Sequence, residues 1–172
     1  MIDRLGDGGC ERLGKAARVA RHIGYVKMIP MTSELFNTMA AMPGAENLQL
    51  PPRCFTEVNA RIVEYVPGME ITIAVPLHER YTNPMGQILG GYLPQFFDLT
   101  FGPLSYLVTQ KPTTSLDINT AFVSPVTPKD EEVVLVASVV NQSRSYLLLE
   151  GRATVGEGWL VATATSRMRI LG

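Results

Sequence analysis

The pattern of apolar and polar positions divides the chain into a helical first third and a strand-rich remainder. From residue 60 onward, runs of alternating or β-branched apolar residues are separated by turn sequences, a pattern typical of strands. One long apolar run of helical composition, residues 89–108, interrupts them. We predict strands at residues 62–66, 69–75, 113–124, 132–140, 145–155 and 159–170. The short connections between the last four strands favour antiparallel neighbours arranged as a meander.

A sheet with one apolar face needs a cover, and the helix predicted at residues 89–108 is the only one apolar enough to provide it. We therefore predict an α+β fold in which a six-stranded, mostly antiparallel sheet wraps around this long central helix. Pro103 lacks the amide hydrogen that a helix interior uses, so a kink or an early helix end is expected near Gly102.

An N-terminal extension is predicted to precede the main domain. Residues 1–56 read as helices and a linker, with helical composition over residues 12–22, and residues 57–172 read as the domain itself.

Ser33 is expected to cap a short amphipathic helix in this extension, and Pro43–Gly44 to end it. The apolar face of this helix carries Met39 and Met42. Methionine fills irregular gaps, so packing is the simpler interpretation, and a place beside a ligand pocket is the alternative.

Composition narrows the class of protein. The 172 residues are 46% hydrophobic and 18% charged, which is typical of a globular domain with a substantial core. The net charge of −1, with Lys and Arg scattered, disfavours nucleic acid or an anionic membrane as a partner. The N-terminus has no early apolar run of the kind found in a secretory signal. Asp98 and the two prolines within residues 89–108 argue against a membrane-spanning helix there.

The cysteines and histidines limit the chemistry further. Cys10 and Cys54 form neither a disulfide framework nor a metal-ligand spacing, and two histidines exclude a His-rich metal site. We expect reduced thiols, a cytoplasmic location, and neither metal nor cofactor.

Asp98 is the only formally charged residue between Tyr81 and Gln110. A carboxylate among phenylalanines and leucines is costly to ionise without a partner, so its presence needs a reason. Small or polar residues recur at helical spacing around it, at Gly91, Gln95, Asp98, Gly102, Ser105 and Thr109. This stripe lacks Lys, Glu and Arg, so it predicts a face that meets another backbone or a ligand. A purely structural carboxylate is the alternative.

Three segments of this sequence resemble the PaaI-like (phenylacetate-pathway-like) branch of the hotdog-fold acyl-CoA thioesterases. They are Asn83 to Asp98, with paired glycines at 90 and 91; Ser115 to Pro125; and Trp159 to Ala164. The resemblance covers residues 60–172, and the preceding extension has no counterpart in it. It implies a hotdog fold and hydrolysis of an acyl-CoA, or a related acyl thioester, to a free acid and a thiol.

The resemblance also implies roles for single residues. The backbone N–H of Gly90 would bind the thioester carbonyl, Asp98 would be the nucleophile or general base, and Asn83 would hold the attacking water or the carbonyl. A turn before Pro84 is the alternative role of Asn83. Further candidates for substrate binding are Gly91, Leu89, Ser115, Tyr81, Met85, Phe97 and Arg144, the last for the phosphates of coenzyme A, with Lys129 and Arg152 as weaker candidates for those phosphates.

One position departs from the family pattern, since Leu89 stands where the signature has a histidine. A backbone amide does not need that imidazole, so the oxyanion site can survive the change. The alternative of a non-catalytic dimer that binds acyl thioesters or fatty acids gains weight from it. A hotdog hydratase needs a histidine with an acid, and the nearest histidine, His78, precedes the Asn83 loop.

The spacing of the two proposed catalytic groups predicts an oligomer. Gly90 and Asp98 are eight residues apart, or roughly 12 Å along one helix at 1.5 Å per residue. They cannot both touch one carbonyl carbon, so Gly90 of one subunit must meet Asp98 of another. We therefore expect a homodimer or a dimer of dimers.

Overall fold

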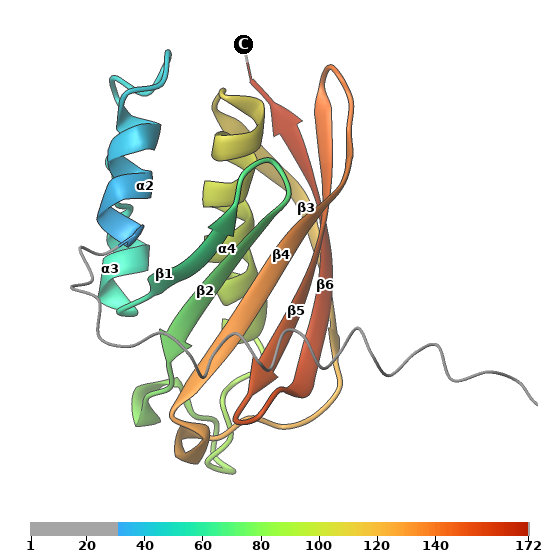
Figure 1. Cartoon of the computed structure of the whole chain (residues 1–172). Helices are drawn as coiled ribbons and strands as arrows, with labels where there is room; N and C mark the ends of the chain where they lie inside the picture. The colour runs from blue at the N-terminus through green and yellow to red at the C-terminus, as the bar shows by residue number, and fades with distance from the viewer. Residues whose placement is uncertain (1–30, 172) are drawn as a thin grey trace, which may run out of the picture.

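The computed structural model describes residues 31–171, and the helix expected at residues 12–22 and Cys10 lie outside that range. Six strands form one antiparallel sheet that curves around the long helix α4, Tyr92–Thr109 (Figure 1). The strands are β1 (Arg61–Val66), β2 (Glu70–Pro76), β3 (Thr113–Phe122), β4 (Glu132–Gln142), β5 (Tyr146–Val155) and β6 (Trp159–Ile170). The expected α+β architecture is therefore confirmed, with every strand pair antiparallel.

The core lies between α4 and the concave face of the sheet. Phe97 and Phe101 of α4 are fully buried, and their rings stack with centroids 5.8 Å apart. Gly151 of β5 lies directly beneath them, and a Cβ atom at that position would approach Phe97 to 2.9 Å. The close approach of helix and sheet therefore depends on a glycine in the middle of a strand.

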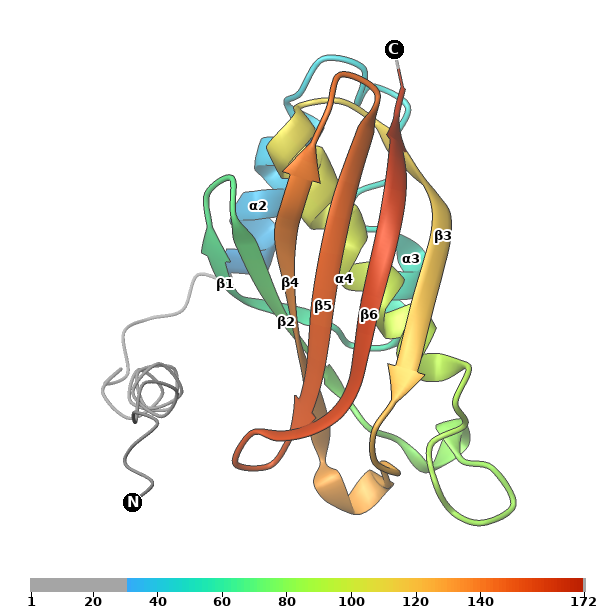
Figure 2. The same ribbon diagram turned by 90° about the vertical axis from the view of Figure 1, so that its right-hand side faces the viewer.

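The order of the strands is β1-β2-β4-β5-β6-β3, so the meander predicted for the last four strands is wrong. β3 forms one edge of the sheet and pairs only with β6, as Figure 2 shows. Helix α4 carries the chain across the sheet, so β3 begins at the edge opposite β1. Residues 123–131, which include the short helix η2 (Pro128–Asp130), then return to the centre of the sheet, a span too long for a tight turn.

The alternation predicted along β3 is broken near its start. The pairing with β6 shifts between Ser115 and Asp117, which leaves Leu116 without a partner and 52% exposed. A bulge of this kind adds one residue to a strand and turns the side chains after it. The regular alternation of buried and exposed positions expected of a strand therefore does not run through the start of β3.

Pro103 lies inside α4 but does not end it near Gly102, so the expected early end is wrong. Leu104 and Leu107 follow the proline and are buried against the sheet, which holds the helix together beyond it. The helix ends at Thr109 because Gln110 adopts the left-handed conformation, with φ of 53°, while its N–H donates to the Tyr106 carbonyl.

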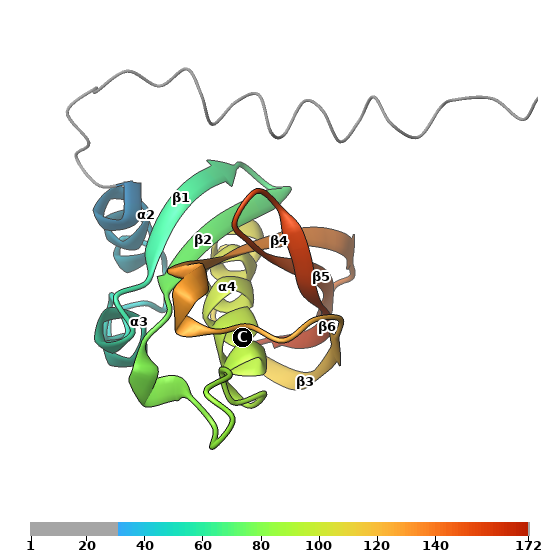
Figure 3. The same ribbon diagram turned by 90° about the horizontal axis from the view of Figure 1, so that it is seen from below.

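Helices α2 (Met31–Ala40) and α3 (Arg53–Glu57) lie on the open side of the curved sheet, beside α4 (Figure 3). The amphipathic helix predicted in the extension is confirmed, but Ser33 is not its cap because Met31 and Thr32 are already helical. Phe36 packs edge-on against Phe55, with ring centroids 5.0 Å apart. Among the described residues, no helix is long and apolar enough to span a membrane.

Candidate active site

The start of α4 presents two backbone amides that have no partner in the structure. The Leu89 N–H donates to the Tyr81 carbonyl at 2.8 Å, and the Tyr92 N–H donates to the Leu89 carbonyl at 2.9 Å. Between them, the N–H groups of Gly90 and Gly91 make no hydrogen bond with any group of residues 31–171. Free amides at a helix N-terminus carry a partial positive charge and suit a developing oxyanion.

Asn83 organises the loop that precedes these glycines. Its Oδ1 accepts hydrogen bonds from the N–H groups of Met85 (2.9 Å) and Gln87 (3.2 Å), and its own N–H donates to the Gln87 carbonyl at 2.7 Å. The structural role considered for Asn83 is therefore present. Its Nδ2 donates to no group of the described chain, and so remains able to bind a water or a carbonyl.

Asp98 lies about two turns into α4, on a face open to solvent in the single chain. The expectation of a carboxylate enclosed among phenylalanines is wrong at this level, because Phe96 and Phe97 are fully buried whereas Asp98 is exposed. The Ser115 hydroxyl of β3 donates to Asp98 Oδ1 at 2.7 Å. The structure thus brings together two of the predicted site residues, and β3 fixes the orientation of the carboxylate.

The stripe of small and polar residues serves two purposes along its length. At its start, Gly91 and Gln95 are exposed beside Asp98. Further along, Ser105 is fully buried and its hydroxyl lies 2.5 Å from that of Thr113 in β3. Only the first part of the stripe is therefore free to meet a second molecule.

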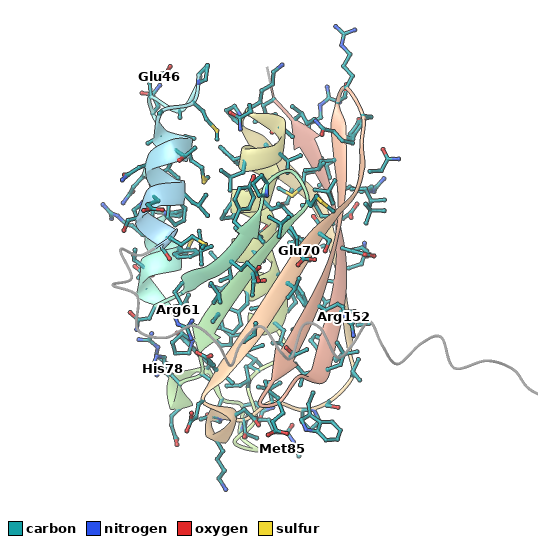
Figure 4. The ribbon with its side chains drawn as sticks, viewed as in Figure 1. Glu46, Arg61, Glu70, His78, Met85 and Arg152 are labelled. Carbon is teal, nitrogen blue, oxygen red and sulfur yellow. The ribbon has the colours of Figure 1, made fainter. Side chains whose placement is uncertain are left out.

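Other predicted residues separate into an exposed and a buried group. Met85 and Leu89 are 78% and 52% exposed, on the loop before α4; Figure 4 shows Met85 at the lower end of the molecule. Tyr81 is buried, and its ring packs on Tyr92 with centroids 4.6 Å apart. Phe97 faces the sheet, so neither Tyr81 nor Phe97 reaches the surface beside Asp98 in the single chain.

The positive side chains considered for coenzyme A lie apart from one another. Arg144 is exposed in the turn between β4 and β5, at the end of the molecule opposite the loop of residues 82–91 (Figure 1). Lys129 in η2 is also exposed, and η2 lies at the same end as that loop. Within one chain, Arg144 is therefore remote from Gly90.

A feature that sequence analysis did not place is a cavity of about 340 Å³ beside Asp98. Side chains of the N-terminal extension line one side of it, and α4 with the start of β3 lines the other. Met39 borders the cavity and Met42 does not. Of the two methionines considered, Met39 therefore lies beside a cavity, and the methionine-rich helix was the one signal of the cavity in the sequence.

Residues 85–162, which include Gly90, Asp98 and Ser115, match the family model of the thioesterase superfamily. This part of the chain is similar to the thioesterase superfamily. The resemblance found in the sequence is confirmed at the level of superfamily and hotdog fold. No curated protein sequence matches the chain.

Several solved structures share the fold of this domain. The PaaI protein of the E. coli phenylacetic acid degradation operon is 14% identical, with a TM-score of 0.64 over 71% of this chain and 86% of its own. A thioesterase from Haemophilus influenzae is 18% identical, with a TM-score of 0.64 over 69% of this chain and 82% of its own. A hypothetical thioesterase from Streptococcus pneumoniae, solved with coenzyme A, is 19% identical, with a TM-score of 0.61 over 66% of this chain and 87% of its own.

Proposed function

We propose that this protein hydrolyses an acyl-CoA, or a related acyl thioester, to a free acid and a thiol. The observation that carries the proposal is the pair of chemical groups on α4. Unpartnered amides stand at its start, and a carboxylate held by Ser115 stands about two turns later. Acyl transfer needs both a donor for the oxyanion and a nucleophile or base. Coenzyme A in the S. pneumoniae neighbour supports coenzyme A as the thiol carrier.

The proposed reaction uses each group once. Asp98 attacks the thioester carbonyl carbon, or takes a proton from a water molecule that attacks it. The carbonyl oxygen becomes an oxyanion and accepts a hydrogen bond from the Gly90 N–H, with Gly91 beside it. The carbon–sulfur bond then breaks, and the thiolate leaves and takes up a proton. If Asp98 is the base, the attacking water has already given the free acid; if Asp98 is the nucleophile, a water molecule then hydrolyses the acyl–Asp98 anhydride, which releases the acid and restores the carboxylate. Asn83 is proposed to orient the water or the carbonyl through its Nδ2.

A single chain is not expected to complete this site, because eight residues at a helical rise of 1.5 Å separate Gly90 from Asp98 by roughly 12 Å. Gly90 lies just before the first residue of α4, and Asp98 lies within the helix. We therefore propose a two-fold dimer in which Gly90 of one subunit faces Asp98 of the other, so that two equal sites form. The free edge of β3 supports this arrangement. It carries exposed Leu116 and Phe122, and the Phe122 ring lies against Gly90, where an added Cβ would be 3.4 Å from it. An apolar edge strand next to the site is a surface that a second copy would cover. A dimer of dimers is the larger assembly compatible with this site.

Leu89 supports the second candidate, a non-catalytic dimer that binds acyl thioesters. It is 52% exposed directly before the paired glycines, where the resemblance leads us to expect a histidine. Loss of that imidazole leaves the backbone amides in place but removes one polar group from the site.

The deciding experiment measures thiol release from a panel of acyl-CoAs with a thiol reagent, and the oligomeric state by light scattering. Hydrolysis by a dimer or larger species is the expected result. Tight binding of acyl-CoA without thiol release would favour the binding protein instead. Full activity from a monomer at micromolar concentration would contradict the shared site.

A further inference from the structure

The described part of the N-terminal extension forms one wall of the 340 Å³ cavity beside Asp98. This wall combines Phe36 and Met39 of α2, Leu48 and Leu50 of the following loop, and Phe55 of α3. The superfamily match begins at residue 85 and the resemblance found in the sequence begins at residue 60, so neither includes the residues of this wall.

The opposite wall belongs to the thioesterase domain and contains the proposed catalytic group. Leu99 and Pro103 of α4 provide apolar surface, and Asp98 and Ser115 border the same space. The cavity therefore places apolar surface next to the hydrogen-bonded carboxylate. A thioester substrate has this same division, since its apolar acyl chain begins at the carbonyl carbon on which the reaction occurs.

The extension wall is anchored to the domain and is preformed. Phe36 and Phe55 are 3% and 1% exposed and pack edge-on against each other. Thr32 Oγ1 accepts a hydrogen bond from the Ile62 N–H of β1 at 2.9 Å, and the Arg80 guanidinium donates to the Glu57 carbonyl at 2.9 Å. Contacts at both ends thus fix the wall, so a ligand does not have to order it, and a preformed apolar pocket is the usual form of a small-molecule site.

We propose, on the basis of the thioesterase function above, that this cavity binds the acyl chain and that the extension sets its maximum length. At ~30 Å³ per water-sized group, the cavity holds about eleven non-hydrogen atoms. This size fits an apolar acyl group of medium length, such as octanoyl, and is too small for hexadecanoyl. Each methylene buried in the cavity strengthens binding by about fourfold, so octanoyl-CoA is preferred over butanoyl-CoA.

The first test fills the cavity and measures chain-length preference. Leu48 is half-buried and lines the cavity, whereas its neighbour Asn47 is exposed and does not. Leu48→Trp is expected to lower kcat/KM for octanoyl-CoA by at least tenfold relative to butanoyl-CoA, and the control Asn47→Trp to leave this ratio as in the wild type. If the wild type hydrolyses both substrates and Leu48→Trp loses the same factor in kcat/KM for each, the acyl-chain proposal is overturned. The thioesterase function stands in that case.

The second test needs no hydrolysis and does not depend on the folding of Leu48→Trp. Cys54 lines the cavity and is exposed, and replacing Cys10 by serine leaves it as the only thiol of the chain. Octanoate is expected to slow alkylation of Cys54 by iodoacetamide at least fivefold, and acetate to leave the rate unchanged. If octanoate protects Cys54 but the protein releases no thiol from any acyl-CoA, the proposed hydrolysis is refuted and the cavity is still supported as an acyl site. An unchanged rate with octanoate overturns the acyl site.

Discussion

Asp98→Asn separates a catalytic carboxylate from a structural one. The substitution keeps the shape of the side chain, and the amide Oδ1 of the new residue can still accept the 2.7 Å hydrogen bond from Ser115. In the wild type the acceptor of this hydrogen bond is charged, and in the variant it is neutral. The weaker hydrogen bond lowers the free energy of unfolding by about 1 kcal/mol. Because Asp98 is exposed in the single chain, no further burial cost is expected. For a chain of this size, the melting temperature should fall by only about 2–4 °C.

The effect on turnover should be much larger. An asparagine side chain is neither a nucleophile nor a base at neutral pH, so thioesterase kcat is expected to fall at least 10²-fold, or about 2.7 kcal/mol in activation free energy. Thiol release and a thermal melt, measured on the same preparation, give both quantities.

The matched control is Asp117→Asn, on the strand that carries Ser115. Asp117 accepts a hydrogen bond from Arg167 Nε at 2.6 Å, in an ion pair whose arginine side chain is 66% exposed. An exposed pair of this kind contributes about 0–1 kcal/mol to stability, and kcat should stay within twofold of the wild type. Two results would refute the catalytic assignment of Asp98. One is near-normal turnover of Asp98→Asn, and the other is a fall in its melting temperature large enough to explain the lost activity.

Three further predictions test the assembly and the core. Mixing Asp98→Asn subunits with Asn83→Ala subunits should restore about a quarter of wild-type activity after random exchange, because half of the dimers then hold one intact site. If mass spectrometry shows that the subunits have exchanged and no activity returns, a site shared between Asn83 and Asp98 is contradicted. Leu116→Lys on the β3 edge should shift the protein to monomers in light scattering and abolish turnover, and an intact dimer would exclude this edge as the interface. Gly151→Ala should lower the free energy of unfolding, measured in urea, by about 1–3 kcal/mol, because the added Cβ would lie 2.9 Å from Phe97. A double-mutant cycle with Phe97→Leu should show that the effects of the two substitutions on stability are coupled.

The sequence predicted the elements well because their signals are local. Residues 89–108 were expected to be the central helix, and α4 spans Tyr92–Thr109. The strands at residues 62–66 and 69–75, which pair as β1 and β2, and the last strands needed only alternation and turn residues. The position of β3 depends instead on where α4 delivers the chain, and the bulge after Ser115 depends on pairing with β6. Neither appears in the local pattern, so the meander was the wrong arrangement.

The candidate site was predicted only in part, because some of its features are local in sequence and others form only in three dimensions. Helical spacing placed Asp98 on the small and polar face. The structure adds the hydrogen bond from Ser115, a residue that the resemblance had offered only as a candidate for substrate binding. The cavity could not be derived, because residues 36–55 meet α4 only in three dimensions and no motif marks that contact. Exposure also changed the interpretation of Asp98, since Phe96 and Phe97, its neighbours in sequence, are buried while Asp98 is exposed.

The two halves of the proposed site should differ in their tolerance of sequence change. The oxyanion donor at Gly90 is a backbone amide, so it persists when Leu89 replaces the expected histidine, provided that the chain still turns into α4 at the same residue. That turn is fixed by the hydrogen bonds of Leu89 and Tyr92 backbone atoms and does not involve the Leu89 side chain. The acid is a side chain, and only Asp98 of α4 carries one. Leu89 should therefore alter acyl preference or rate, whereas the loss of Asp98 should remove the reaction.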